Sequence, residues 1–393
     1  MRKWLALLLI LILSGAGYSV WAISRPLPKL KPSYTIAQQK LVDPPPNIAW
    51  SVYGQQALGV TGYGVVATKG EQKAAPMASV AKVMLALALL DKKPLQLNQT
   101  GPNIDITAAD VATYQQYYSS GQSVVAVRAG VSLTQYQALQ ALLLPSANNI
   151  ATLLANWVFG SQQAYLAEAN AYAKKLGMNS TTFADASGFS ASTLSTASDL
   201  VLLGQTAMQN PVIAQIVNQK TATIPVAGVI KNYNLALGIS GIDGIKTGSS
   251  GDAGGCFLFS TDFKGTKLIA AIVGAPDRGT AVNDAPAIAA SFKKALQIDN
   301  VLPSGQTYAK YVAPWGETAE AKIQTNVDVI DWLNTKHSIS ASAKDLSAGT
   351  ASGETVGEAT FTYRGKQYKS PLILSNNISG PSIWWRLTHP ATK

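Results

Sequence analysis

A serine and a lysine three residues apart give the strongest chemical signal in this sequence. Ser79 and Lys82 stand in Ala-Ser-Val-Ala-Lys, directly before the apolar run 83–90. Residues three apart share one face of a helix, so the two side chains can meet there. Serine is a weak nucleophile until a base removes its proton, and a lysine in apolar surroundings can lose its charge and become that base. The pair therefore predicts Ser-Lys acyl-transfer chemistry.

The rest of the chain offers little for a Ser-His-Asp triad. It contains only two histidines, His337 and His389, both near the C-terminus. A second Ser-x-x-Lys begins at Ser291, but its two adjacent lysines in a mixed polar segment are typical of a solvated helix face. One Ser-x-x-Lys is thus weak evidence by itself, and other motifs must decide.

Two further short motifs follow in order. Ser-Ala-Asn at 146–148 comes after a leucine run that ends in a proline, so a loop is expected there. Lys-Thr-Gly at 246–248 ends the apolar strand pattern 242–245. A Ser-Asn-Asn at 375–377 also fits the middle motif, but it follows the third one. The ordered triple is far more specific than any of its parts.

This triple resembles the signature of the penicillin-recognising serine hydrolases. The flanks at 77–84, 145–149 and 243–248 look like those of the low-molecular-mass penicillin-binding proteins, the D-alanyl-D-alanine carboxypeptidase family (serine peptidase family S11). Segments 185–188 and 195–200 resemble that family's spacers. The resemblance extends over 48–298, with Ala147 and Ser249 as departures that concern substrate preference.

The resemblance implies an α/β (α+β) domain of the β-lactamase/transpeptidase type. An antiparallel sheet would be flanked by helices, with a helical subdomain, and a small all-β domain would follow. The patterns predict a strand-turn-strand over 49–67 with its turn at 53–56, and a buried helix after Ser79. They also predict helices at 133–158, 161–176, 197–208 and 281–297, strands at 242–246, 255–261 and 267–274, and a hairpin at 358–374.

The resemblance also implies catalytic roles. Ser79 would attack the carbonyl between two D-alanines and form an acyl-enzyme. Lys82, neutralised by burial and by the charge of Lys246, would accept the serine proton. Ser146 would pass a proton to the departing amine.

The substrate would be held by residues of the second and third motifs. Asn148 would keep Lys82 and the substrate amide in register. Lys246 and Thr247 would bind the terminal carboxylate, and Gly248 would let the substrate backbone lie against the strand edge.

Backbone N–H groups of Ser79 and Ser249 would form the oxyanion hole. Arg278 is interpreted as a surface arginine, with attraction of the substrate carboxylate as the alternative.

Composition restricts the partners. The net charge is +10, but no basic run with interleaved aromatics occurs, which argues against nucleic-acid binding. Anionic wall polymers, lipid headgroups or a plain solubility balance each explain this charge. The single cysteine, Cys256, excludes an internal disulfide, and we expect neither a metal nor another cofactor.

The N-terminus predicts export. Arg2 and Lys3 precede the apolar stretch 5–13, which is typical of a secretory signal peptide cleaved after Ala22. An uncleaved membrane anchor is the alternative, because 4–23 nearly reaches the length of a span. The expected organisation is a signal peptide or anchor at 1–22, a proline-rich linker at 23–47, a catalytic domain at 48–298 and a β-rich domain at 299–393.

We therefore predict an extracytoplasmic D-alanyl-D-alanine carboxypeptidase, in the cell wall or at the outer face of the membrane. Its substrate would be the peptidoglycan pentapeptide stem, and β-lactam antibiotics would acylate it. A β-lactamase or an endopeptidase of the same superfamily is the alternative enzyme, and a silent wall-binding protein the alternative of another class. The pair Trp384-Trp385 beside Arg386 would either pack one module on another or touch a membrane or partner.

Overall fold

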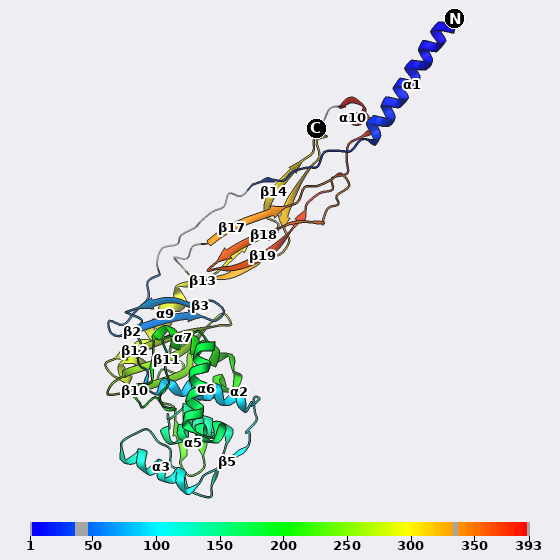
Figure 1. Ribbon diagram of the computed structural model, residues 1–393. Helices are drawn as coiled ribbons and strands as arrows, with labels where there is room; N and C mark the ends of the chain where they lie inside the picture. The colour runs from blue at the N-terminus through cyan, green and yellow to red at the C-terminus, as the bar shows by residue number, and fades with distance from the viewer. Residues whose placement is uncertain (1, 36–45, 333–336, 391–393) are drawn as a thin grey trace. The chain divides into compact units, whose positions relative to one another are not determined.

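The structure, a computed structural model, describes residues 2–35, 46–332 and 337–390 (Figure 1). The chain forms two compact units. Asn47–Ala295 is called the central unit here, and Met1–Pro46 together with Leu296–Lys393 the terminal unit.

The central unit is built on a five-stranded antiparallel sheet. Its strand order is β10-β11-β12-β2-β3. The bounds are β2 Gln55–Val60, β3 Gly64–Lys69, β10 Ile242–Ser250, β11 Gly254–Phe263 and β12 Thr266–Ala275. Strands β2, β11 and β12 are buried along most of their length, because helices cover the sheet.

Two long helices pack on this sheet. Helix α7 (Ala197–Gln209) contacts β2 and β12, and α9 (Arg278–Lys294) contacts β10 and β11. Gly204 of α7 lies so close to β12 that a Cβ there would be 2.6 Å from Ile269 Cγ2. Both helices were predicted from the sequence and are confirmed, with α9 beginning three residues earlier than expected.

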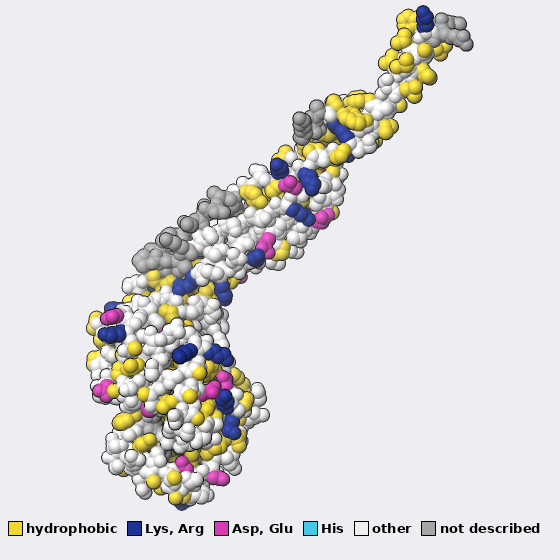
Figure 2. Space-filling model, viewed as in Figure 1, with side chains coloured by type: hydrophobic (Ala, Val, Ile, Leu, Met, Phe, Trp, Pro, Cys, Tyr) yellow, Lys and Arg dark blue, Asp and Glu magenta, His cyan; other side chains and the backbone are white. Residues whose placement is uncertain are grey.

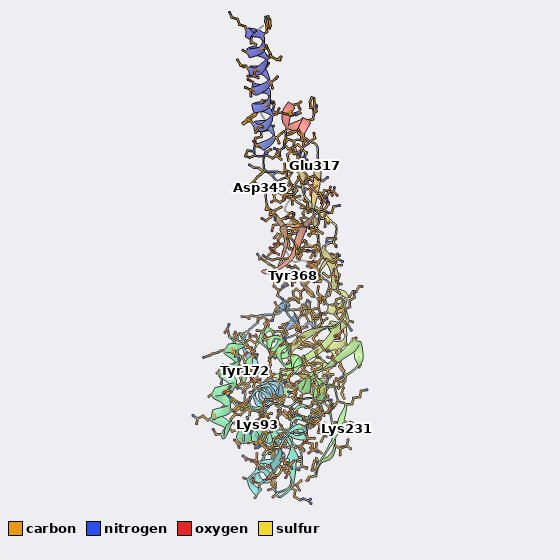
Figure 3. The ribbon with its side chains drawn as sticks, turned by 90° about the vertical axis from the view of Figure 1, so that its right-hand side faces the viewer. Lys93, Tyr172, Lys231, Glu317, Asp345 and Tyr368 are labelled. Atoms are coloured by element: carbon orange, nitrogen blue, oxygen red, sulfur yellow. The ribbon has the colours of Figure 1, made fainter. Side chains whose placement is uncertain are left out.

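A helical part surrounds the buried helix α2 (Lys82–Lys92), whose residues 82–90 are all buried. Lys93, at its C-terminal end, places its ammonium 4.8 Å from the centre of the Trp157 ring. Figure 3 labels Lys93 and also Tyr172, which belongs to another helix of this helical part. The surrounding helices are α3 Ala108–Ser119, α4 Gln135–Leu143, α5 Asn148–Phe159, α6 Gln162–Lys175 and α8 Pro211–Val217.

Short elements connect these layers. The 3₁₀ turns are η1 Ala78–Ala81 and η2 Ile239–Gly241. The described residues also form four small strand pairs outside the main sheet, three in the central unit and the last, β13 with β16, in the terminal unit. They are β4 Ala75–Pro76 with β7 Leu194–Ser195, β5 Asn103–Asp105 with β6 Ser132–Thr134, β8 Thr221–Ile224 with β9 Gly228–Lys231, and β13 Leu296–Leu302 with β16 Val327–Trp332.

The first predicted turn was misplaced. Gln55 and Gln56 open strand β2 rather than a turn, and both side chains are buried. Gln56 Oε1 accepts a hydrogen bond from Ser51 N (3.1 Å), and Gln55 Nε2 donates to Lys73 O (2.6 Å). The turn lies instead between β2 and β3, at Gly62 with φ +86°. The two polar residues suggested an exposed turn, whereas the fold buries their side chains and satisfies them with backbone groups of residues 51 and 73.

The predicted helix at 133–158 is two helices, α4 and α5. They are separated by the loop that contains Ser146, where Pro145 had predicted a break. Helix α6 and its Gly177 C-cap (φ +78°) are confirmed. Helices α3 and α8 and the β8–β9 hairpin were not predicted.

The terminal unit contains a six-stranded sheet of order β1-β14-β15-β19-β18-β17. The predicted hairpin is confirmed as β18 and β19, joined at Arg364-Gly365. Strand β1 lies in the segment expected to be a linker, and it pairs with β14. The bounds are β1 Ser33–Tyr34, β14 Thr307–Val312, β15 Thr318–Ile323, β17 His337–Ala343, β18 Thr355–Tyr363 and β19 Lys366–Leu374.

Two helices in the terminal unit come from opposite ends of the sequence. Helix α1 spans Arg2–Ser24 and α10 spans Ile383–Thr388. Within the described residues, Lys3–Ser24 is long and apolar enough to cross a membrane. Figure 2 shows hydrophobic side chains along the exposed length of α1.

Candidate active site

The Ser79–Lys82 pair forms where η1 runs into α2. Lys82 is the first residue of α2, and Ser79 lies one turn earlier in η1. The Lys82 Nζ atom donates a hydrogen bond to Ser79 Oγ at 2.8 Å. Ser79 is partly exposed and Lys82 is 0% exposed. A nucleophile that solvent can reach thus contacts a base that is fully buried.

The surroundings of Lys82 favour its neutral form. Burial lowers its pKa well below the ordinary lysine value, and the charge of Lys246 lowers it further, while Asp185 opposes the shift. Lys82 Nζ also donates to the backbone oxygen of Ser187 at 2.7 Å. A neutral amine can keep that bond and still has a lone pair with which to accept the Ser79 proton.

The loop after residue 184 is organised by one carboxylate. Asp185 Oδ2 accepts hydrogen bonds from Ser187 N (3.1 Å), Ser187 Oγ (2.6 Å) and Phe189 N (3.0 Å). Its Oδ1 accepts from Thr193 Oγ1 (2.6 Å). These bonds fix the Ser187 carbonyl that receives Lys82. The sequence had suggested this segment only as a spacer.

Gly188, in the same loop, lies against the nucleophile's turn. Its φ is +76°, and a Cβ there would be 1.9 Å from Ala78 O. Ala78 itself has φ +47°, an uncommon value for a residue with a side chain. The glycine therefore permits the tight approach of the loop to η1.

Strand β10 supplies the third motif. Lys246 and Thr247 are buried, and Lys246 Nζ donates to Thr247 O at 2.9 Å. Burial, with a contribution from the charge of Arg278, lowers the pKa of Lys246 to about 7. A ligand carboxylate would favour the charged form again, because opposite charges attract in a site of low polarity.

Gly248 has a closer neighbour than the sequence suggested. A Cβ at this position would lie 2.9 Å from the backbone nitrogen of Ser79 and 3.0 Å from Ala78 Cβ. Gly248 thus lets β10 approach η1 next to the Ser79 N–H, one of the two predicted oxyanion donors. This is a second reason for glycine at this position, in addition to the predicted approach of the substrate backbone.

The second motif lies between α4 and α5. Ser146 has φ +67°, and its buried Oγ has no hydrogen-bond partner among the described residues. Asn148 Nδ2 donates to Gln122 Oε1 at 2.7 Å, and its buried Oδ1 is likewise unpartnered. The predicted hold of Asn148 on Lys82 is therefore not among the described hydrogen bonds. Gln122 takes the amide instead.

A narrow cleft brings the motifs together. The residues lining it come from η1, the loop after α3, the loops before α5 and β10, strand β10 itself and the start of α9. They are Ser79, Ser123, Ser146, Tyr233, Thr247, Gly248, Ser249 and Arg278. Lys82, Lys246 and Asn148 are buried next to this lining. Ser79 and Ser249, whose N–H groups were the predicted oxyanion donors, both border the cleft.

Arg278 combines the two interpretations that the sequence allowed. It is exposed, as a surface arginine is, yet it also lines the cleft, and its guanidinium lies 4.7 Å from the centre of the Tyr233 ring. The predicted surface position agrees with this exposure, and the place of Arg278 in the cleft lining is also compatible with the alternative, attraction of a substrate carboxylate. Tyr233 and Ser123 were missed altogether, because neither belongs to a motif and only the folded loops bring them here.

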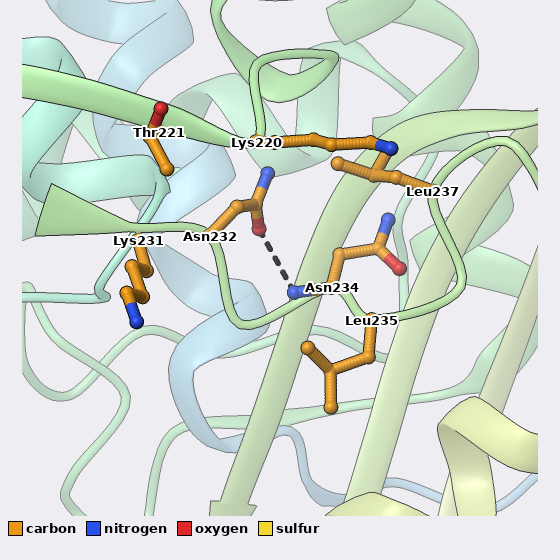
Figure 4. A pocket seen from close by; sticks show the side chains of 7 residues that line it. All are labelled: Lys220, Thr221, Lys231, Asn232, Asn234, Leu235 and Leu237. Carbon is orange, nitrogen blue, oxygen red and sulfur yellow. Dashed lines mark hydrogen bonds between the residues drawn. The ribbon is translucent and has the colours of Figure 1, made fainter.

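A larger groove of about 270 Å³ lies beside the β8–β9 hairpin (Figure 4). Asn232 and Asn234 line it and flank Tyr233 in the chain; Asn232 Oδ1 accepts from Asn234 N at 2.9 Å. The groove contains two lysines but no paired nucleophile and base. The remaining lining residues are Lys220, Thr221, Lys231, Leu235 and Leu237. Chemistry, rather than size, therefore identifies the smaller cleft as the candidate active site.

Within the described part of the chain, no group of three or more His, Cys, Asp or Glu side chains is arranged to hold a metal ion. Cys256 is buried, and burial raises the pKa of its thiol to about 11. A thiolate nucleophile is therefore disfavoured at this position.

Fold and cleft together define a serine hydrolase of transpeptidase-like architecture. The Streptomyces K15 DD-transpeptidase superposes with a TM-score of 0.55 at 25% identity, covering 63% of this chain and 99% of that one. A D-alanyl-D-alanine carboxypeptidase from Francisella tularensis gives 0.61 at 19% identity, covering 87% and 97%. These likenesses confirm the predicted fold class.

The chain belongs to the D-alanyl-D-alanine carboxypeptidase family of serine peptidases, whose sequence model matches residues 60–277. A D-alanyl-D-alanine carboxypeptidase of Mycobacterium tuberculosis is 36% identical over 216 residues, which is 53% of this chain and 70% of that protein. A D-alanyl-D-alanine endopeptidase of Escherichia coli is 27% identical over 261 residues, 59% of this chain and 78% of that protein. The predicted resemblance and the assignment as a serine-type carboxypeptidase, a hydrolase, are confirmed.

Proposed function

We propose that this protein removes the terminal D-alanine from peptidoglycan pentapeptide stems through an acyl-enzyme on Ser79. The observation that carries the proposal is the 2.8 Å contact of Ser79 Oγ with the fully buried amine of Lys82. The work would take place outside the cytoplasmic membrane, where the stems are.

The first step is acylation. Neutral Lys82 takes the hydroxyl proton as Ser79 Oγ forms a bond to the carbonyl carbon of the penultimate D-alanine. The bond from that carbon to the leaving nitrogen then breaks. Ser146, whose Oγ is buried without a protein partner, passes the proton from Lys82 to this nitrogen. Free D-alanine departs.

Recognition of the substrate carboxylate would come from β10 and α9. Lys246 and Arg278 supply positive charge and Thr247 a hydroxyl, and Arg278 and Thr247 line the same cleft. N–H groups of Ser79 and Ser249 would stabilise the oxyanion, and one such donor is typically worth about 3–4 kcal/mol. Asn148, with a free Oδ1, would accept from the substrate amide.

In the second step water attacks the acyl carbon. Lys82 accepts a proton from that water, the bond to Ser79 Oγ breaks, and the proton returns to the serine. None of the residues lining the described cleft is Asp or Glu. Without a carboxylate base next to the ester, a penicilloyl adduct on Ser79 would be long-lived, and β-lactams would act as inhibitors.

The test is release of D-alanine from a peptide ending in D-Ala-D-Ala, measured with the full-length protein. We expect release by the parent and a loss of about 10³-fold or more in Ser79→Ala. Mass spectrometry after exposure to penicillin should show a penicilloyl adduct on the peptide that contains Ser79. An inactive parent that is also unlabelled by penicillin would contradict the proposal and favour a silent wall-binding protein.

An endopeptidase is the second candidate, because the Escherichia coli relative of that name aligns over 78% of its length. Cross-linked dimeric stems distinguish the two activities. We expect the monomeric pentapeptide to be cleaved faster than the cross-link. The reverse order would assign the endopeptidase, and rapid turnover of penicillin would assign a β-lactamase.

A further inference from the structure

The two ends of the chain are joined at the C-terminal end of α1. Tyr18 Oη donates a hydrogen bond to Leu387 O at 2.6 Å. Arg386 Nη1 donates to Ile23 O at 2.7 Å and to Arg25 O at 3.1 Å. The last carbonyls of a helix have no partners within the helix, and a cation there also interacts favourably with the helix dipole. Arg386 of α10 thus serves as a cap for α1.

The contact is reciprocal. The guanidinium of Arg25, just past the end of α1, donates to the backbone oxygens of His389 and Pro390, which follow α10. Each helix therefore receives an arginine from the segment of the other. This set of contacts between residues 18–25 and 386–390 is called the clasp.

Helix α10 and the segment before it are in turn held by the loop between β14 and β15. The Trp385 ring lies edge-on to Trp315, with centroids 5.8 Å apart. Trp315 Nε1 donates to Glu317 Oε2 (2.8 Å), which also accepts from Gly380 N (3.2 Å). The hydrogen bond from Trp315, with that from Gly380, lowers the pKa of Glu317. Glu317 is labelled in Figure 3, close to α10.

The clasp also contains the residue after which a signal peptide would be cut. Ala22 is 0% exposed and lies within α1, between Tyr18 and Arg25. Cutting there would remove Tyr18 and detach the helix that Arg386 caps. The packing therefore favours a helix kept in the mature protein, which is the alternative to cleavage after Ala22.

Exposed side chains in and beside the clasp are of types suited to a membrane interface. Trp384 is 74% exposed and Ile383 62%, and both come from α10. Trp21 and Tyr18 of α1 are also exposed. Tryptophan and tyrosine concentrate where hydrocarbon meets headgroups, and Arg25 and Arg386 match the charge of anionic phospholipids.

The length of α1 fits the same partner. The 22 residues of Lys3–Ser24 rise about 33 Å at 1.5 Å each, close to the roughly 30 Å of a bilayer's hydrocarbon core. The clasp therefore falls where such a helix would leave the bilayer. Positive charge at Arg2 and Lys3 favours the cytoplasm for the other end.

We propose that α1 is retained as a transmembrane anchor and that α10 rests on the outer phospholipid surface, fixed to α1 by the clasp. The partner of the exposed Ile383–Trp384 face is the lipid bilayer itself. The inference does not depend on the proposed reaction, since all of its residues lie in the terminal unit.

Retention is tested on full-length protein recovered from cell membranes. We expect an N-terminal sequence at or next to Met1 and persistence in the membrane after an alkaline wash. A mature chain beginning at Ile23 and released by the wash would overturn the proposal.

Seating on lipid is tested with a single fluorescent label. Because Cys256 is buried, Trp384→Cys provides one accessible thiol. The protein is reconstituted in phosphatidylcholine–phosphatidylglycerol vesicles with a quencher attached near the headgroups. We expect at least about a twofold loss of emission at position 384. Lys366→Cys, at the start of β19, is the matched control and should keep its emission. Tyr368, two residues further along β19, is labelled in Figure 3 away from α10. Equal emission losses at both positions, or none at 384, would overturn lipid seating.

The clasp is tested by hydrogen exchange on the same vesicles. Arg386→Ala removes two hydrogen bonds, so amide exchange over 383–390 should accelerate about tenfold or more. Exchange in β18 and β19 should not change, which shows that the sheet is intact. Arg128→Ala, an exposed arginine of the central unit, is the matched control. Unchanged exchange over 383–390 in Arg386→Ala would exclude the clasp.

Discussion

The catalytic proposal depends on two lysines that are buried within one site. An ammonium group in such surroundings loses its hydration, and a second positive charge nearby adds repulsion. Lys82 and Lys246 experience both effects. Lys82 contacts the nucleophile, while Lys246 lines up beside Thr247 on β10. Burial thus favours the neutral Lys82 that a base requires, and a bound carboxylate would favour the charged form of Lys246 again.

The charge on Lys246 should be visible in the pH dependence of acylation. Lys246→Gln removes the repulsion on Lys82, so the pKa of Lys82 rises. A smaller fraction of Lys82 is then neutral at any given pH, and the acid limb of the rate profile moves to higher pH. The measurement is the rate constant of penicillin acylation between pH 5 and 9, where the shape of the profile is compared rather than its height.

Lys246→Arg is the matched control for this experiment, because it keeps the charge while it changes the shape of the donor. Its acid limb should stay close to that of the parent, even where binding weakens. An acid limb that does not move in Lys246→Gln would show that Lys246 leaves the protonation of Lys82 unaffected.

The site was predictable from the sequence where residue type alone determines chemistry. Ser79, Lys82, Ser146 and Lys246 stand in motifs, and the structure places them around one cleft. Arg278 and Tyr233 could not be found in this way, because an exposed arginine and an isolated tyrosine resemble surface residues everywhere. Their role in the cleft follows from the positions of α9 and of the loop before β10.

At the scale of elements, the loop 184–193 positions the base as much as α2 does. Asp185 fixes Ser187, and the Ser187 carbonyl receives Lys82 at 2.7 Å. Gly188 brings this loop to the turn that holds the nucleophile. Sequence patterns predicted the neighbouring helices and strands, because their apolar periodicity is local. They did not predict the loop's contacts, which join residues about 105 positions apart.

Gly188→Ala should therefore impair catalysis as well as stability. The new Cβ would lie 1.9 Å from Ala78 O, so either the loop or η1 must move. The left-handed backbone adds about 1–3 kcal/mol of strain. We expect a lower melting temperature and a fall of about tenfold or more in the rate of penicillin acylation.

Gly177→Ala is the control for the strain alone. Gly177 has almost the same φ, +78°, but a Cβ there meets nothing within 4 Å. This variant should lose stability and keep the acylation rate of the parent at 25 °C. Equal acylation rates in the two variants would show that the approach of Gly188 to Ala78 does not position the nucleophile.

At the scale of the whole molecule, the chemistry and the anchoring features belong to different units. Every residue lining the cleft lies within Asn47–Ala295, whereas α1, α10 and the clasp lie in the terminal unit. The buried apolar cluster around α2 runs from Ala57 to Val273, wholly inside the central unit. A change of composition predicted a boundary near residue 298, and the compact central unit ends at Ala295. The pairing of β1 with β14 was not predicted, because a strand of two residues carries too little pattern.

The central unit should therefore fold and react alone. A chain of residues 47–295 retains the buried cluster and all hydrogen bonds of Lys82. We expect it to be soluble and to release D-alanine from a soluble pentapeptide with kcat/KM within about threefold of the full-length value.

Ser79→Ala in the same short chain is the control for contaminating activity. A folded but inactive short chain, with normal circular dichroism and no penicillin labelling, would show that the terminal unit contributes to the reaction itself. Retained activity on the soluble peptide, together with reduced activity on membrane-associated substrate, would assign the terminal unit to placement of the enzyme.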